Sequence, residues 1–490
     1  MGTRSEQELV RLEKLRALRE DGFIYPNDTK PTASSSELAQ GSYMEGEEGP
    51  RFTICGRIVQ MRQMGKASFC HLLDSEGKIQ TYIRKDDIGE AEYSRFKNYD
   101  VGDIIEVSGF LFTTRTGEKT LHAETVRLLS KCLIPLPEKW HGLTDVEARY
   151  RHRYVDLIAN PEVREVFRKR AQIIRLVRHF LDRHDYLEVE TPTLTYSSTG
   201  AEARPFNTHY NALNADMRLR VALELPLKKL VVGGLERVYE ISKVFRNEGL
   251  SKKHNPEFTM LEFYGSYLTF EDQLQFVEEM VCELVQEMNG NLDLPYGDHQ
   301  ISFQRPWKII SMTESLYEYA DVPRSEDIEN LDVLHQIAAN RQVELPEPED
   351  WGRCLEELWG ELVEPKLINP TFITHHPFSI SPLARKTPGH PSVVDRFELI
   401  ISGMEISNAF SELNDPLDQR ERFEAQAARR AAGKEDANDI DHDFLRALEY
   451  GMPPTGGVGI GIDRLIMLLT NSPTIRDVLL FPQLRPLEEE

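Results

Sequence analysis

The densest group of side chains that could do chemistry is the stretch "FRNEGLSKKHNPEFT", residues 245–259. Arginine suits bidentate contact with phosphate, and phenylalanine can stack on a purine. We expect a strand at 238–248 and a returning strand at 257–264 that present these groups to one pocket. The residues that this hairpin would bring together are Glu240, Ser242, Arg246, Glu248, Lys252, Lys253, His254, Phe258, Met260, Glu262 and Tyr264.

A second group is "FELIISGMEISNAFSELND", residues 397–415. If residues 402–403 form a two-residue turn, Glu405 lies opposite Ile400 and shares a face with Glu398. Two such carboxylates suit Mg²⁺ that bridges phosphates, although an exposed ion-paired strand is an alternative. Only a bulge near Ser407 would bring the following polar side chains into the same pocket. These are Asn408, Phe410 and Glu412.

The third group is "GGVGIGIDRLIMLLT", residues 456–470. Its alternating glycines, Gly457, Gly459 and Gly461, leave one strand face bare, so a ligand can lie flat against the backbone. We expect Asp463 to cap the helix that follows and Arg464 to lie in its first turn. The run is neither a GxGxxG fingerprint nor a GxxxxGK[ST] loop, and close packing alone could also explain it.

The charge distribution separates one region from the rest of the chain. The 490 residues include 58 basic and 81 acidic side chains, a balance of −23 that argues against a general nucleic-acid coat. Residues 51–137 instead hold 13 basic and 11 acidic side chains, which gives +2. Five cysteines without a CxxC pair favour reduced thiols in a cytoplasmic enzyme. No signal peptide or apolar membrane span is expected.

The pattern of elements predicts an α+β protein in several parts. The pattern of residues 6–20 predicts an amphipathic helix, which would serve either for packing or as an arm on a nucleic acid. The composition of residues 26–50 predicts a linker. Short alternating strands with a helical piece at 87–99 predict a five-stranded OB-fold β-barrel at 51–137, with a purely structural barrel as the alternative. A connector at 138–160 leads to a domain at 161–490, built on an antiparallel β-sheet flanked by helices.

The three groups together resemble the motifs of the class II aminoacyl-tRNA synthetases. "FLDRHDYLEVETPTL", with Pro192, resembles motif 1 near 175–195, while 238–264 resembles motif 2 and 456–470 motif 3. The N-terminal barrel is similar to that of subclass IIb, which holds the lysine, aspartate and asparagine enzymes. "ARPFNTHYNAL", "KKLVVGGLERVYEI" and "NAFSELNDPLDQRERFEAQ" resemble the lysyl-tRNA synthetases, and the similarity covers nearly the whole chain.

The resemblance implies activation of L-lysine with ATP and Mg²⁺, then transfer to the 3′ end of tRNA(Lys), by a cytoplasmic homodimer joined through motif 1. Arg246 would act at the α-phosphate, Arg464 at the γ-phosphate, and Phe258 against adenine. The implied ATP site is Arg246, Glu248, His254, Phe258 and Arg464, and the implied metal ligands are Glu398 and Glu405. The implied lysine pocket is Gly200, Glu224, Glu262, Tyr264, Asn408, Phe410 and Glu412. The implied anticodon readers are Arg62, Phe69, Gln80 and Glu118. Lys252 and Lys253 are assigned to the tRNA acceptor end.

Three other functions stay open at this point. Aspartyl or asparaginyl specificity is disfavoured because an aspartate pocket needs a cation where Glu224, Glu262 and Glu412 supply carboxylates. A paralogue that lysylates a protein would lack the barrel. A non-catalytic paralogue would lose Arg246, Arg464 or the carboxylate pair. Two departures from the family pattern, Pro226 and the segment 372–381, affect details of the amino-acid pocket.

Overall fold

The computed structural model describes residues 4–41, 49–137, 143, 145–197, 200–431 and 440–486. The chain forms two compact units, Met1–Thr144 and Asp145–Glu490. The boundary falls inside the expected connector 138–160. Two helices of that segment, α5 (Val146–Arg151) and α6 (Arg153–Ala159), lie in the second unit. Within the described ranges, no helix combines the length and the apolar character needed to cross a bilayer.

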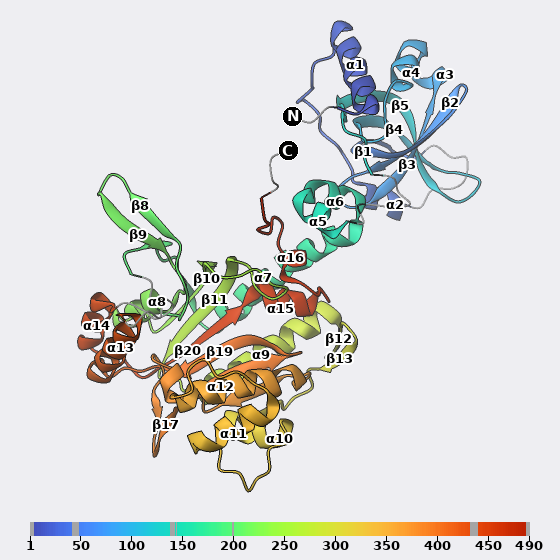
Figure 1. Cartoon of the computed structure of the whole chain (residues 1–490). Helices are drawn as coiled ribbons and strands as arrows, with labels where there is room; N and C mark the ends of the chain where they lie inside the picture. The colour runs from blue at the N-terminus through green and yellow to red at the C-terminus, as the bar shows by residue number, and fades with distance from the viewer. Residues whose placement is uncertain are drawn as a thin grey trace. The chain divides into compact units, whose positions relative to one another are not determined.

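The first unit is built on a closed five-stranded barrel, as expected for an OB-fold (Figure 1). Its strands alternate buried and part-exposed residues because successive side chains point to opposite faces, so Ser68, Cys70 and Leu72 of β2 all face the core. The strands run in the order β1-β2-β3-β5-β4. Their bounds are β1 (Arg51–Met64), β2 (Ala67–Leu73), β3 (Lys78–Arg84), β4 (Ile104–Thr113) and β5 (Lys119–Ser130), with α3 (Lys85–Ile88) and α4 (Glu90–Phe96) between β3 and β4.

The N-terminal helix forms as expected over α1 (Glu6–Glu20). Ser5 and Glu8 close a capping box at its start, and Gly22 takes φ 85° just beyond its end. Within the expected linker 26–50, the described residues include a short helix. This helix is α2 (Ser35–Gln40), whose Leu38 is 2% exposed within the barrel core.

The second unit carries an eight-stranded sheet in the order β14-β15-β18-β19-β20-β11-β10-β6. The six central strands pair antiparallel, as predicted, whereas β14 and β6 pair parallel at the two edges. The bounds are β6 (Leu187–Glu188), β10 (Arg237–Phe245), β11 (Glu257–Ser266), β14 (Lys308–Ser311), β15 (Thr371–Thr374), β18 (Arg396–Ile401), β19 (Met404–Ser411) and β20 (Thr455–Gly461).

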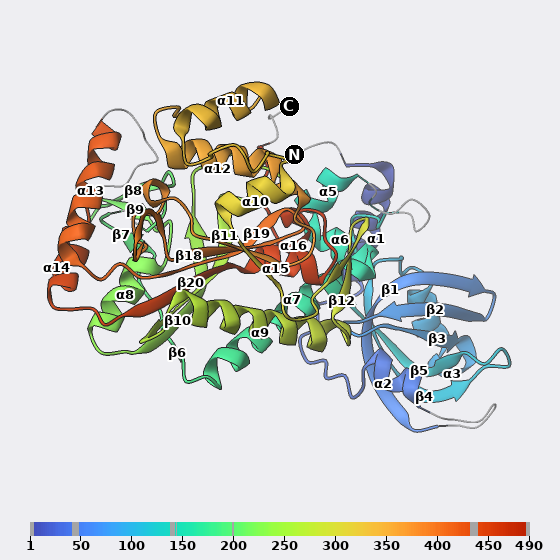
Figure 2. The same ribbon diagram turned by 90° about the horizontal axis from the view of Figure 1, so that it is seen from below.

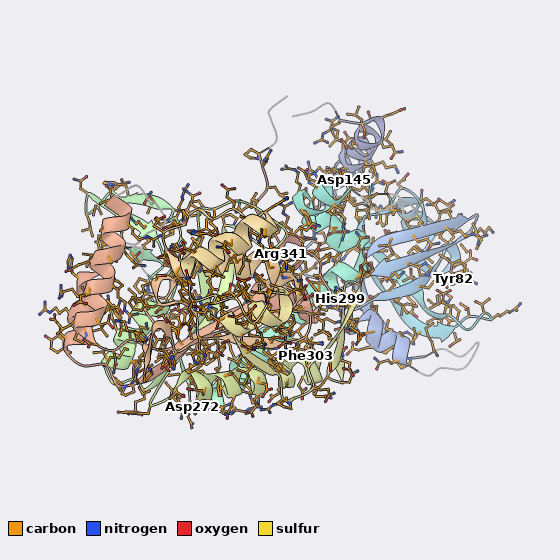
Figure 3. The ribbon with its side chains drawn as sticks, turned by 60° about the horizontal axis from the view of Figure 1, so that its bottom comes forward. Tyr82, Asp145, Asp272, His299, Phe303 and Arg341 are labelled. Carbon is orange, nitrogen blue, oxygen red and sulfur yellow. The ribbon has the colours of Figure 1, made fainter. Side chains whose placement is uncertain are left out.

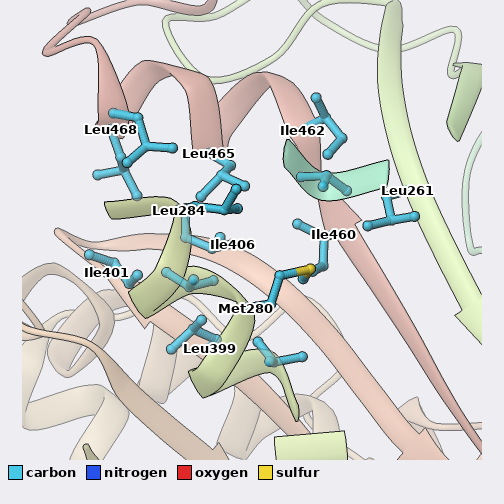
Figure 4. Packing of buried hydrophobic residues seen from close by; sticks show 14 of the residues in the cluster. Leu261, Met280, Leu284, Leu399, Ile401, Ile406, Ile460, Ile462, Leu465 and Leu468 are labelled. Atoms are coloured by element: carbon cyan, nitrogen blue, oxygen red, sulfur yellow. The ribbon is translucent and has the colours of Figure 1, made fainter. Parts of the chain in front are cut away.

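One face of this sheet packs against α9 (Phe270–Asn289) and α15 (Ile462–Leu469), and α7 (Pro161–Asp182) joins the same core. Figure 2 shows α9 running along the sheet. In Figure 4, Met280 and Leu284 of α9 meet Leu399, Ile406 and Ile460 of the central strands. This apolar layer fixes the strands from one side and leaves the other face available for polar side chains.

The remaining elements surround the open face and the ends of the sheet. A short β-hairpin made by β8 and β9 projects from the second unit (Figure 1). The small strands are β7 (Leu194–Thr195), β8 (Asn207–Tyr210), β9 (Ala215–Leu219), β12 (Asp293–Tyr296), β13 (His299–Ser302), β16 (Lys386–Thr387) and β17 (His390–Val394). The helices are α8 (Glu224–Val232), α10 (Met312–Tyr319), α11 (Leu331–Arg341), α12 (Trp351–Leu362), α13 (Pro416–Ala431), α14 (His442–Glu449), α16 (Ile475–Val478) and the 3₁₀ turns η1 (Glu364–Lys366) and η2 (Phe378–Ile380).

Candidate active site

A cavity of about 410 Å³ in the second unit brings the three sequence groups together. All the residues assigned to the ATP and amino-acid pockets line it, and so do the three alternating glycines of β20. The predicted residues on its wall are Gly200, Glu224, Arg246, Glu248, His254, Phe258, Glu262, Tyr264, Glu405, Asn408, Phe410, Glu412 and Arg464. One site therefore holds cationic side chains as well as carboxylates.

The hairpin β10–β11 supplies Arg246 from its loop and the Phe258 ring from its second strand. Its first strand ends at Phe245, three residues earlier than predicted, so Arg246 begins the loop instead of continuing the strand. Val244 pairs with Phe258, which places the Arg246 guanidinium 5.2 Å from the centroid of the Phe258 ring. Burial lowers the pKa of Arg246, opposed by the nearby Glu405 and Glu248 carboxylates. Arginine remains charged under such conditions, so the cavity holds a poorly hydrated cation.

Two residues of the predicted hairpin face are occupied elsewhere. Glu240 and Ser242 are not among the described residues that line the cavity, because Arg220 lies against them. Its Nη1 donates to Glu240 Oε1 at 2.8 Å. Lys252 and Lys253 are both exposed in the loop after β10; Lys253 also lines the cavity, and its Nζ donates to the carbonyl of Gly403.

The β18–β19 hairpin has the predicted turn and the predicted bulge. Ser402 and Gly403 adopt φ 51° and 61°, and Glu405 pairs with Ile400. The register then shifts by one residue, since the next pair is Leu399 with Ser407. This bulge lets Glu405 share the cavity wall with Asn408, Phe410 and Glu412, which a regular strand would turn away.

The carboxylate pair of this hairpin fits a cation that arrives with phosphates. Glu405 lines the cavity and accepts from Arg464, whereas Glu398 is not among the described residues that line it, and its Oε1 accepts from Arg396 at 2.6 Å. No group of three or more His, Cys, Asp or Glu side chains in the described ranges could hold a metal alone. Mg²⁺ commonly takes one or two carboxylates and completes its shell with water and substrate phosphates, so two carboxylates are a sufficient protein contribution.

Arg464 reaches the same region from α15. Its Nη1 donates to the Glu405 carbonyl at 2.8 Å, and its Nη2 lies 3.1 Å from His254 Nε2. Burial and the Arg464 charge lower the pKa of His254, which keeps the ring neutral and able to accept. Asp463 does not cap the helix as expected. It accepts from the Thr259 backbone N–H at 2.7 Å and from Arg170, and so ties α15 to β11 and α7.

The glycine face of β20 allows close approach, as predicted. A Cβ at Gly457 would lie 2.0 Å from Glu412 Oε1 and 2.4 Å from Tyr264 Cε1, whereas at Gly459 the nearest atom would be Met260 Cε at 3.1 Å. Only glycine at position 457 therefore leaves room for the Glu412 carboxylate and the Tyr264 ring together.

Three buried carboxyl groups form the inner end of the cavity. Glu262 accepts from the Leu223 backbone N–H and from the Tyr264 hydroxyl, both at 2.9 Å. Burial, together with the Glu224 charge, raises the pKa of Glu262 to about 7. Both oxygens of the Glu412 carboxylate are buried, and Oε1 has no hydrogen-bond partner among the described residues. Buried polar atoms are normally paired, so this oxygen indicates a missing donor from a ligand.

The unusual Pro226 is compatible with this geometry. Glu224 is the first residue of α8, so Pro226 lies in the first turn, where no intrahelical N–H bond is lost. Glu224 consequently keeps its place on the cavity wall.

Sequence reasoning missed several polar residues around the cavity. Arg396 donates to Asn408 through Nε at 3.0 Å and to Glu398 through Nη2. Arg396 stands two residues before Glu398 on one strand, so strand alternation could have predicted that both side chains share a face. Glu356 lines the cavity from α12, and burial raises its pKa to about 7. Nothing in the spacing around α12 connects it to the motifs. Lys228, fully buried behind Glu224, was also missed.

The predicted anticodon readers gather on the outer surface of the barrel in the first unit. Arg62 pairs with Phe69 across β1 and β2, and the Phe69 ring lies 4.8 Å from that of Tyr82, which is labelled in Figure 3. Gln80 Nε2 donates to Glu118 Oε2 at 2.7 Å. Stacking rings beside hydrogen-bonding amide and carboxylate groups are the elements of single-stranded base recognition.

Comparisons with known proteins agree with both units. A family described as tRNA synthetases class II (D, K and N) matches residues 145–485, and an OB-fold nucleic acid binding domain matches residues 52–129. A lysine–tRNA ligase of Bacillus subtilis (strain 168) is 48% identical over 488 residues, which cover 98% of this chain and 97% of the relative. A lysine–tRNA ligase of Moorella thermoacetica is 50% identical over 485 residues and 98% of each chain. One of Pelotomaculum thermopropionicum is 49% identical over 483 residues, with 98% and 95% covered.

The close packing at Gly457 gives a testable prediction. Gly457→Ala should lower the free energy of unfolding by about 1–3 kcal/mol, because the new methyl group overlaps Glu412 and Tyr264. Gly459→Ala, on the same face, meets only the flexible end of Met260 and should cost clearly less. Denaturant unfolding followed by tryptophan fluorescence measures both. Equal stabilities of the two variants would contradict the assigned packing.

Proposed function

The chain belongs to the class II tRNA synthetases of the D, K and N group, and we propose that it is a lysine–tRNA ligase. It activates L-lysine with ATP to lysyl-adenylate and pyrophosphate, then transfers lysine to the 3′ end of tRNA. The observation that carries the choice of amino acid is the group of buried carboxyl groups Glu224, Glu262 and Glu412 on one cavity wall.

Recognition of lysine follows from the cost of dehydrating an ammonium group. Such a group enters a buried site only where carboxylates replace its water. Glu262 receives only neutral donors from the protein, and Glu412 Oε1 has none among the described residues, so both have capacity for a charged donor. Aspartate or asparagine would bring only an α-ammonium group and no side-chain cation. At least one of these carboxyl groups would then stay unpaired, which disfavours binding of either amino acid.

Activation is in-line attack of the lysine carboxylate on the α-phosphorus, with pyrophosphate leaving. The reaction needs positioning and charge neutralisation more than it needs a base. Arg246 lines the same cavity as the three carboxyl groups and lies against the Phe258 ring, which supports its proposed contact with the α-phosphate beside an adenine held by that ring. Arg464 and His254 extend the positive and donor groups to the distal phosphates.

Glu398 and Glu405 would hold Mg²⁺ together with the ATP phosphates. The ion supplies neutralisation of phosphate charge when bound. Its two proposed ligands are held in advance by arginine side chains, Glu398 by Arg396 and Glu405 by Arg464. Arrival of the phosphates gives Arg464 a second anionic partner and frees the Glu405 carboxylate to bind the cation.

The barrel of the first unit is proposed to bind the tRNA anticodon through Arg62, Phe69, Gln80 and Glu118. His71 extends this group, since its Nε2 lies 3.0 Å from Glu118 Oε1. The formal net charge of residues 51–137 is +2, whereas that of the whole chain is −23, and this difference supports RNA contact by the barrel.

We also propose a homodimer that joins through motif 1, in the cytoplasm. The exposed apolar side chains Leu187 and Leu194, 51% and 45% exposed at the sheet edge and beside it, support a partner surface there. All five cysteines are free, which suits a reducing compartment.

The activation step gives a direct test. In ATP–pyrophosphate exchange across the twenty amino acids, the wild-type protein should respond to lysine most strongly. Arg246→Ala should lower lysine-dependent exchange by roughly 10²–10³-fold, because it removes a preorganised cation at the reacting phosphate.

Arg237→Ala is the matched control, since Arg237 is exposed at the opposite end of the same strand. Exchange that is stronger with aspartate or asparagine than with lysine would overturn the proposed specificity. If Arg246→Ala kept the wild-type rate of lysine-dependent exchange, the assigned phosphate contact would be excluded.

The anticodon assignment is tested by separating the two steps of the reaction. Phe69→Ala should raise KM for tRNA by about tenfold or more in aminoacylation, because a stacked base contributes about 1–3 kcal/mol. Lysine-dependent exchange without tRNA should stay at the wild-type level, since Phe69 lies in the other unit. Unchanged charging, or a parallel loss of exchange, would argue against Phe69 as a base reader.

A further inference from the structure

A lysine of the chain itself lies among the carboxylates of the proposed lysine pocket. The side chain of Lys228 is fully buried, and its Nζ lies 2.5 Å from Glu224 Oε1 and in a second ion pair with Glu412. The Nζ is also 5.4 Å and 5.9 Å from the ring centroids of Phe410 and Phe444. The buried ammonium group of Lys228, surrounded by two carboxylates and two aromatic rings, is therefore the internal counter-ion of these carboxylates.

Lys228 contacts these carboxylates from outside the cavity lining. Glu224, Phe410 and Glu412 line the cavity, whereas Lys228 does not. Glu224 and Lys228 are four residues apart on α8, on the same face of the helix, and Glu412 directly follows β19. Lys228 thus joins a helix to the end of a central strand and leaves the cavity side of both carboxylates open.

The charges of the pocket explain why an internal cation is useful. When all are ionised, Glu224, Glu262 and Glu412 bring three negative charges and Lys228 brings one positive charge, so the sum is −2. Because burial raises the pKa of Glu262 to about 7, this full charge is reached only when a cation binds. Of two neighbouring arginines, Arg396 pairs with Glu398, and Arg246 lies near the Glu405 and Glu248 carboxylates, of which Glu405 also pairs with Arg464. Free lysine at neutral pH carries two ammonium groups. The balance of −2 therefore equals the positive charge that lysine introduces, while its carboxylate faces the Arg246 end.

We propose that Lys228 is a positioning and specificity-determining residue, which favours the ionised forms of Glu224 and Glu412 and fixes their positions on the cavity wall, so that the pocket matches a substrate with two ammonium groups. Burial raises the pKa of both carboxyl groups, and the Lys228 charge opposes that rise. The proposal rests on the proposed lysine-activating function. Burial disfavours the ionised forms of Glu224 and Glu412. Without Lys228, both carboxylates would therefore take up protons or turn away. Lysine would then have to displace those protons on binding, and its affinity would fall.

Lys228→Met tests this role, with Lys229→Met as the matched control. Lys229 is the next residue of α8 and pairs at the surface with Asp443 at 2.7 Å. Lys228→Met should raise KM for lysine at least tenfold in ATP–pyrophosphate exchange while KM for ATP changes less than twofold. Lys229→Met should leave both values unchanged. Equal KM values for lysine in Lys228→Met and wild type, or a parallel rise in KM for ATP, would overturn the proposal.

A rescue experiment separates charge from packing. In Lys228→Ala, methylammonium should lower KM for lysine at least threefold, and neutral methanol at the same concentration should not. Equal effects of the two additives would overturn the proposal, because they would indicate that only volume matters. If these truncations fail to fold, Lys228→Gln keeps hydrogen-bond donors without charge and should show the same selective rise in KM. A wild-type KM in Lys228→Gln would also overturn it. Failure of lysine-dependent exchange in the wild-type protein would instead contradict the proposed function.

Discussion

Burial of three carboxyl groups around one small cavity is the constraint on which the rest of the structure depends. An unpaired carboxylate in a protein interior costs several kcal/mol, so each must have a partner. Glu262 uses the Leu223 N–H and the Tyr264 hydroxyl, and Glu224 shares Lys228 with Glu412. Oε1 of Glu412 has no donor among the described residues. The site is thus stable enough to exist without a ligand and is completed by a cation.

The sheet makes this arrangement possible because one of its faces packs in the apolar core and the other lines the cavity. One face packs against α9 and α15 through aliphatic side chains, which fixes the positions of the central strands. The other presents residues from β11, β18, β19 and β20 to the cavity. Asp463 links the helix that carries Arg464 to the strand that carries Phe258. The phosphate end and the carboxylate end of the site are therefore parts of one rigid sheet.

Much of this was predictable from the sequence where local rules decide the outcome. The turn at Ser402 and Gly403, the bulge near Ser407 and the bare glycine face follow from strand alternation and turn chemistry. The rest depends on long-range packing. Glu240 has the correct strand phase, but Arg220, distant in sequence, binds it. Lys228 falls on a helix of ordinary composition, and its partner Glu412 is far along the chain. Such contacts carry no local signal.

The charge account of the pocket is tested most directly by counting protons during lysine binding. Isothermal titration calorimetry in two buffers with different ionisation enthalpies gives the number released. Because burial and the Glu224 charge raise the pKa of Glu262 to about 7, the free carboxyl is largely protonated at pH 6 and ionised at pH 8. Binding an ammonium group requires the ionised form, so Glu262 should release roughly 0.9 proton at pH 6 and roughly 0.1 at pH 8 when lysine binds. Burial also raises the pKa of Glu224 and Glu412, so protons held by these groups add to the release. Binding enthalpies that do not depend on the buffer at pH 6, or net proton uptake, would contradict the account.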